Sequence, residues 1–357
     1  MAANGAEPGE PTRWARASTV RTAAAWMVVA AGSWWLLGEL AAVLRPLLLA
    51  VFLGYVLMPY YSRLRHQMSA PVAIGLLAGL TTGVLVALAL AVYTSLLGLA
   101  EELPNIQARS ADLIRGATEW GKSLPYIGQT IGQAEVPEGQ LAQQVGSVTL
   151  QVVNRAGGVL VEAAAAGLYL LFLLLESTRF PHRVRAAYPP DQAEYILDVF
   201  GRINSAIISY LKAKVKSGLV LAVPAGLILA ALGVKFSLLW AVLTFLCNFI
   251  PYIGTVVAYA LPVAFAFLLT PDPVWKPVTA AVLLAVWHGV SASVIEPLIL
   301  GRAVGLSPLV ILAALSVWGL LWGLPGMFLA VPLTVVLKIV FENIEATRPL
   351  ARLLSGA

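Results

Sequence analysis

The chain has 357 residues, of which 59% are hydrophobic and only 11% are charged, with a net charge of +5. A soluble domain carries roughly 25% charged residues, so this chain could not cover a globule of its length with polar groups, and we predict that most of its surface faces lipid. The basic residues form no dense run with interleaved aromatics, which argues against a nucleic-acid partner. The single cysteine, Cys247, permits neither an intrachain disulfide nor a cysteine metal cluster.

The chain opens with a polar tail, residues 1–21, which contains three arginines. Residues 22–99 follow and hold three apolar segments that we predict to be membrane helices. A cleaved signal peptide is the alternative for the first segment. Trp34 and Trp35 argue against it, because they stand where a cleavage site needs small residues and because tryptophan suits a membrane interface.

Residues 100–152 are the only sizeable hydrophilic insertion between apolar segments, with six acidic and three basic residues. Apolar positions recur there at helical spacing, as at Leu141, Val145 and Val148. The pattern predicts amphipathic helices outside the membrane. Residues 153–177 then form a predicted fourth membrane segment.

Residues 178–216 contain a predicted amphipathic helix that begins near Asp191, just after two prolines. Lys212, Lys214 and Lys216 stand at the end of this helix. A cytoplasmic membrane surface attracts lysines in such a position, so we expect all three lysines to lie at that surface.

Residues 217–341 hold two long apolar stretches that are broken by proline and glycine rather than by charge. The first break contains Pro251 and Gly254, and the second contains Pro325 and Gly326. Each stretch is longer than the ~20 residues that a helix needs to cross a bilayer. Broken helices at membrane depth are tolerated only where the freed backbone is buried in protein or lines a cavity, and secondary transporters build substrate sites in this way. Transport is therefore the first functional hypothesis.

Basic residues predict the orientation, because lysine and arginine mark the cytoplasmic side of membrane proteins. Of the 23 such residues, 16 fall on the side of both termini, which includes the short tail 342–357. Eight full crossings satisfy this bias, and six crossings plus two re-entrant hairpins satisfy it equally. We therefore predict an all-α polytopic membrane protein with about eight transmembrane helical elements and both termini in the cytoplasm.

Several motifs resemble the signature of the autoinducer-2 exporter family, also called PerM-type permeases. They are NFIPYIG (248–254), EPLILGRAVGLSPL (296–309) and GLPGMFLAVPLTVVLK (323–338), while residues 44–64 are similar to that family's early proline-anchored helix. The resemblance implies bacterial inner-membrane proteins with about eight membrane helices, assembled as homo-oligomers, with a pentamer as the candidate assembly. It also implies a link to export of the furanone signal autoinducer-2 or, in some members, to sodium or proton antiport. It does not define the substrate.

Polar residues in the apolar region are the candidates for a site. Glu296, before Pro297, either caps a helix at the interface beside Arg302 or takes part in gating or ion coupling, because an intramembrane carboxylate is costly unless paired or hydrated. His288 is either a packed membrane histidine or a proton-coupling group. Asn248 either satisfies backbone groups freed by the break or contacts a polar substrate. The transport or gating candidates are Asn248, Pro251, Gly254, His288, Glu296, Pro297, Gly301, Pro325 and Gly326.

Two patterns suggest enzymes, and the sequence around each argues against it. GATEWGKS (116–123) matches the phosphate-binding loop, but the residues before it are polar and helical, and Pro125 follows almost at once. His288 and Ser291 could form a hydrolytic pair, but no nucleophile elbow accompanies them. We expect no enzyme, no cofactor and no metal.

The sequence therefore predicts a secondary transporter of the autoinducer-2 exporter family, which moves a small polar molecule or ions across the inner membrane by alternating access. An oligomeric channel or pore is the first alternative. A membrane scaffold that transports nothing and binds partners through its amphipathic helices is the second.

Overall fold

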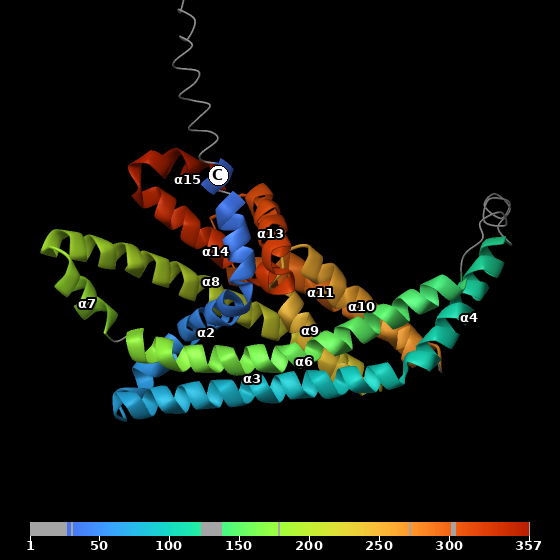
Figure 1. Ribbon diagram of the computed structural model, residues 1–357. Coiled ribbons are helices and arrows are strands. Elements are labelled where there is room, and N and C mark those ends of the chain that lie inside the picture. The colour runs from blue at the N-terminus through green and yellow to red at the C-terminus, as the bar shows by residue number, and fades with distance from the viewer. Residues whose placement is uncertain are drawn as a thin grey trace, which may run out of the picture.

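The computed structural model describes residues 27–29, 31–122, 138–177, 179–270, 273–300 and 305–356, which form helices joined by short connections (Figure 1). No β-strand occurs in these ranges, where strand-like pairing is limited to an isolated bridge between Leu306 and Ser355. The predicted all-α class is confirmed. The helices are α2 Ala41–Leu64, α3 Ala70–Glu101, α4 Leu103–Lys122, α6 Glu138–Ser177, α7 Phe180–Ala187, α8 Pro190–Ala231, α9 Ser237–Cys247, α10 Ile253–Leu269, α11 Trp275–Val290, the π-helix η1 Ser291–Ile295, α12 Glu296–Leu300, α13 Pro308–Trp322, α14 Leu324–Asn343, the 3-10 helix η2 Glu345–Thr347 and α15 Arg348–Leu354.

Five helices in the described residues are long and apolar enough to cross a membrane, and a sixth span is reached if the bent pair Val161–Ser177 and Phe180–Ala187 counts as one. The five are α2, α3, α8, α14 and the stretch Trp275–Ile299 that joins α11 to α12. This confirms a polytopic membrane protein. Three further apolar helices, α9, α10 and α13, have only 11, 17 and 15 residues. At 1.5 Å per residue α9 is about 16 Å long, which is about half of the ~30 Å hydrocarbon layer.

Two predicted segment boundaries fall far inside single helices. The boundary at residues 216/217 lies within α8, which runs unbroken for 42 residues, and the boundary at 152/153 lies within α6, which has 40. In α8 the reason is that Ser217 and Gly218 are buried and continue the packed face, with Gly218 directly against Phe245. At about 63 Å, α8 is twice as long as the hydrocarbon layer is thick, so part of it stands outside the membrane.

Both broken stretches fold back on themselves. Helices α9 and α10 pack together as one hairpin, and α13 and α14 pack together as a second (Figure 1). The breaks occur where proline and glycine predicted them. The short α9 favours a re-entrant hairpin for the first stretch, whereas in the second stretch α14 is long enough to cross alone.

Helix α8 is the centre of the packing. It contacts α2, α7, α9, α11, α12 and α14, while α3 and α6 lie side by side along another side of the molecule (Figure 1). The core around α8 includes Tyr210 and Leu211 from α8 itself, Phe249 from the first break and Leu329 from α14. The middle of α8 therefore packs against both hairpins.

An ion pair ties the start of α4 to the connection between α8 and α9. The Glu102 carboxylate accepts a hydrogen bond of 2.8 Å from Asn105 and one of 2.5 Å from Lys235. These two donors, Asn105 first and Lys235 second, lower the pKa of Glu102. Arg109 of α4 donates to the Leu268 carbonyl at the end of α10, at 3.0 Å. The amphipathic helix α4 is therefore docked on the first hairpin.

Candidate functional site

A cavity of about 580 Å³ lies between α8, the first break, α12 and the second hairpin. Its wall combines polar and apolar side chains. Two polar residues come from α8, and three successive residues come from the break itself. The lining residues are Tyr210, Lys214, Asn248, Ile250, Pro251, Tyr252, Thr255, Val256, Ala292, Glu296, Ile311 and Val331.

The first break is a tight, strained turn. Asn248 caps α9, and Tyr252, just before α10, has φ +64°, a conformation that non-glycine residues rarely adopt. A β-carbon at Gly254 would lie 1.7 Å from the Cys247 carbonyl oxygen. Only glycine fits there, because the two arms of the hairpin meet backbone to backbone. Such strain occurs preferentially at functional sites.

A partly buried ion pair lies on one side of the cavity. The Lys214 ammonium donates to a Glu296 carboxylate oxygen at 2.7 Å and to the Asn248 backbone carbonyl at 2.9 Å. The Lys214 side chain is 4% exposed, and that of Glu296 is 30% exposed. The pair therefore joins α8, the end of α9 and the start of α12 at one point, and the carboxylate faces the cavity.

The π-helix η1 directly precedes Glu296. It interrupts the α-helical register between α11 and α12 for five residues, with Ser291 buried at its start. Short π segments inside α-helices are rare and are frequent at functional sites. Glu296 is the first residue after this segment, at the start of α12.

The second hairpin turns at Gly323, which has φ +67°. A β-carbon at Gly326 would lie 1.9 Å from the Trp318 carbonyl oxygen, so this hairpin also needs glycine where its arms meet. Ile250 of the first break packs against Ala314 and Ala330 of the second hairpin. The first break therefore packs against the arms of the second hairpin, which sequence spacing alone could not show.

The structure brings some of the predicted residues together and separates others. Asn248, Pro251 and Glu296 line the cavity. Gly254 and Gly326, beside the half-buried Pro325, shape the two hairpin turns and do not line it. Pro297 is exposed. Gly301 lies outside the described residues, as does Arg302, the predicted capping partner of Glu296.

His288 is buried away from the cavity. Its ring lies edge-on to Tyr259, with centroids 5.9 Å apart, and its Nδ1 is 2.9 Å from the Leu284 carbonyl oxygen. The imidazole therefore faces its own helix and α10 rather than Ser291. This geometry fits the packed-histidine interpretation better than the coupling or hydrolytic ones.

The prediction that Lys214 lies at the membrane surface is wrong. Lys212 and Lys216 are exposed, but Lys214 is buried because it follows Leu211 by three residues and Ile207 by seven, on the packed face of α8. That spacing was the signal that could have identified Lys214. The sequence motif GATEWGKS likewise lies in the helix α4 up to Lys122, not in a loop that could cradle phosphate.

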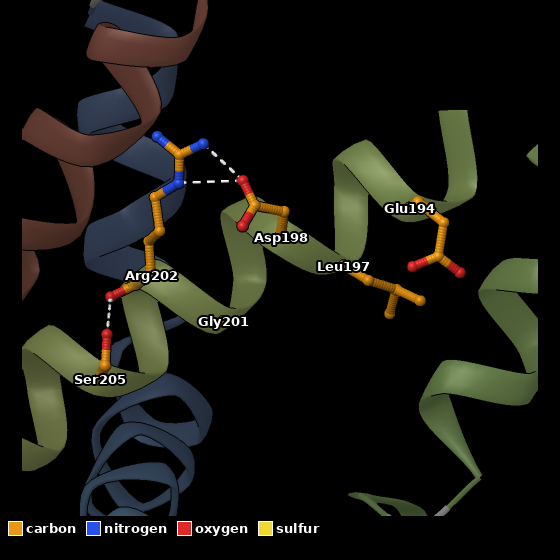
Figure 2. Close-up of a pocket in the computed structure, with 6 residues that line it drawn as sticks. All are labelled: Glu194, Leu197, Asp198, Gly201, Arg202 and Ser205. Carbon is orange, nitrogen blue, oxygen red and sulfur yellow. Dashed lines mark hydrogen bonds and ion pairs between the residues drawn. The ribbon is translucent and has the colours of Figure 1, made fainter. Parts of the chain in front are cut away.

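A second, open depression lies on the N-terminal half of α8 (Figure 2). Its charged groups are already paired: Arg202 donates from Nε to Asp198 at 3.0 Å, and Glu194 accepts from Arg185 at 2.9 Å. Both pairs are well exposed. We do not regard this depression as the site, because exposed local pairs of this kind neither enclose a ligand nor hold an unpaired charge.

Comparison with known proteins identifies the family. The model of the AI-2E family transporters matches residues 24–346. The chain belongs to the AI-2E transporter family. It is 29% identical over 315 residues to YhhT of Escherichia coli strain K12, whose name assigns it to transport, with 88% of each chain covered. It is 28% identical to the AI-2 transport protein TqsA of the same strain, with 88% of this chain and 90% of TqsA covered.

A third relative is a Haemophilus influenzae protein that is also named for transport. It is 33% identical over 215 residues, which cover 58% of this chain and 61% of the relative. The family, the relatives and the membrane-length helices together show that this chain is a membrane transport protein. The cavity between the first break and the second hairpin is thus the candidate transport site of an AI-2E family member.

Proposed function

We propose that this chain is a secondary transporter that carries a small polar molecule across the bacterial inner membrane by alternating access. The observation that supports this is the cavity between the two hairpins, with the Lys214–Glu296 pair on one side. Secondary transporters place substrate at such breaks and alternate by moving one packed unit against another. Here the moving units are the two hairpins, which meet at Ile250 and flank α8.

The cavity wall suits a small molecule with both polar and apolar faces. Lys214 can donate hydrogen bonds, Glu296 can accept them, and Thr255 can do both, while Ile311 and Val331 offer apolar surface. Pockets for small ligands combine apolar walls with a few polar groups in this manner. Because the relative TqsA is named for AI-2 transport, we propose the furanone signal autoinducer-2 as the first substrate to test.

Filling the cavity should block transport. Ile311→Trp adds bulk to the cavity wall, whereas Leu312→Trp adds the same bulk to an exposed position on the same helix. We expect Ile311→Trp to reduce autoinducer-2 flux in proteoliposomes at least about tenfold, which corresponds to about 1.4 kcal/mol, and Leu312→Trp to retain it. Equal flux in both variants would show that substrate does not pass this cavity.

Counterflow separates a carrier from the alternative of an oligomeric channel or pore. A carrier exchanges labelled for unlabelled substrate and saturates, because its site faces one side at a time. A pore dissipates the gradient without exchange, and a scaffold moves nothing. We expect exchange from this chain, which we also propose to work as a homo-oligomer.

Topology gives an independent test of the proposed orientation. After Cys247 is replaced by serine, a cysteine introduced at Gln129, in the hydrophilic insertion, should react with a membrane-impermeant maleimide in intact cells. The positive-inside bias puts this insertion outside the cytoplasm and both termini within it. A cysteine at Arg65, on the predicted cytoplasmic side, is the matched control and should react only after lysis. The reverse pattern would contradict the orientation.

A further inference from the structure

The Lys214 ammonium contacts two oxygen atoms of kinds that also bind metal cations. It is 2.7 Å from a Glu296 carboxylate oxygen and 2.9 Å from the Asn248 backbone carbonyl, and both of these groups are ligands that alkali and alkaline-earth cations prefer. The carbonyl belongs to the C-terminal end of α9, where the helix dipole adds partial negative charge. Carboxylates and the ends of broken helices are what transporters use to hold coupling ions.

The Asn248 carbonyl is the one that the break turns toward α8. The carbonyls of Thr244, Leu246 and Cys247 accept backbone N–H groups from residues 248, 249 and 250. The Asn248 carbonyl accepts from the lysine of another helix instead. The partial negative charge at the C-terminal end of α9 is therefore balanced from outside the hairpin, by the ammonium of Lys214 on α8.

We propose that Lys214 is a tethered cation that occupies a monovalent-cation site formed by Glu296 and the end of α9. The chain then carries the ion that would otherwise have to bind from solution, and neither Na⁺ nor K⁺ is needed to neutralise this site. The inference rests on the proposed function only in taking the adjacent cavity as the substrate path.

The charges around the pair support this assignment. The other titratable side chains that line the cavity are Tyr210 of α8 and Tyr252 of the break. The side chains that η1, α13 and α14 contribute are Ala292, Ile311 and Val331, which are apolar. Among the side chains that line the described cavity, Lys214 is therefore the one that neutralises the Glu296 carboxylate. Removing the ammonium leaves one negative charge, a free carbonyl and the space of the lysine. A small cation from solution can enter this space and neutralise the charge, or a proton on Glu296 can neutralise it instead.

The test compares Lys214→Ala with the double variant Lys214→Ala, Glu296→Gln, which has the same space but no charge. Each purified protein is melted in sodium, potassium or choline chloride of equal ionic strength, at alkaline pH. We expect the melting temperature of the wild type to be the same in all three salts. Lys214→Ala should melt higher in NaCl or KCl than in choline chloride, by on the order of 5 °C, and the double variant should not respond.

The remaining outcomes are equally decisive. If Lys214→Ala folds in none of the salts while the double variant folds, no cation from solution can replace the ammonium, and the inference is wrong. If the two variants behave alike, in folding and in salt response, Lys214 does not occupy a cation site and the inference is wrong. A wild type that Na⁺ stabilises over choline would also overturn it. Melting uses no substrate, so a failure of transport would refute the proposed function and leave this result unaffected.

Discussion

Glu296→Leu is expected to destabilise the protein by about 3–5 kcal/mol, because it leaves the Lys214 charge buried with only a backbone carbonyl as its partner. Lys214→Met should cost less. It leaves the carboxylate of Glu296, which is 30% exposed and can take up water or a cation from the cavity. The measurement is the melting temperature of the purified protein, together with the yield of folded protein on size exclusion.

The double variant Lys214→Met, Glu296→Leu separates charge from shape. Replacing both partners of a buried ion pair by apolar residues of similar size is often neutral or stabilising, so we expect the double variant to melt close to the wild type. Asp198→Asn, which unpairs the exposed Arg202 (Figure 2), is the surface control and should cause no measurable change. A double variant no more stable than Glu296→Leu alone would contradict this account.

Gly254→Ala and Gly326→Ala should each disrupt a hairpin. The added methyl groups would lie 1.7 Å from the Cys247 carbonyl oxygen and 1.9 Å from that of Trp318. These neighbours are backbone atoms, which cannot turn aside as a side chain can, so each arm must move. We expect either change to lower the free energy of unfolding by about 3 kcal/mol, again followed as the melting temperature, and to abolish transport.

The matched control is Gly79→Ala in α3. A β-carbon there meets nothing within 4 Å, and alanine favours helix more than glycine does. This variant should melt at the wild-type temperature or above it. If all three alanine variants melt alike, the close backbone contact at the breaks is not what holds the hairpins together.

The sequence predicted the break positions, because proline and glycine disrupt a helix wherever they cluster in an apolar stretch. It placed the end of the third apolar segment at residue 99, two residues before the observed end of α3 at Glu101. It did not show that single helices continue through the predicted limits of the insertion and of the amphipathic segment. A change in polarity along the chain marks where a helix leaves the membrane, not where the helix ends, and α6 and α8 run through both predicted limits.

The candidate site shows the same division. Asn248, Pro251 and Glu296 were identified from their chemistry. Polar groups and helix breaks in apolar segments cost free energy unless they are paired, hydrated or buried in protein, so they mark candidate sites. Lys214 was missed because a lysine near two other lysines is typical of a membrane surface. Its burial became visible only when the packed face of α8 was known.

The sequence by itself determined a helical membrane protein, two broken stretches and a family, because hydrophobicity, helix breakers and motifs are properties of neighbouring residues. Only the tertiary structure decided that the first break meets the second hairpin and that Lys214, Asn248 and Glu296 converge, although 34 residues separate the first two and 82 separate Lys214 from Glu296. The physical reason is that such a contact depends on which faces of distant helices pack together. Helical spacing gives the face of each helix but not its partner.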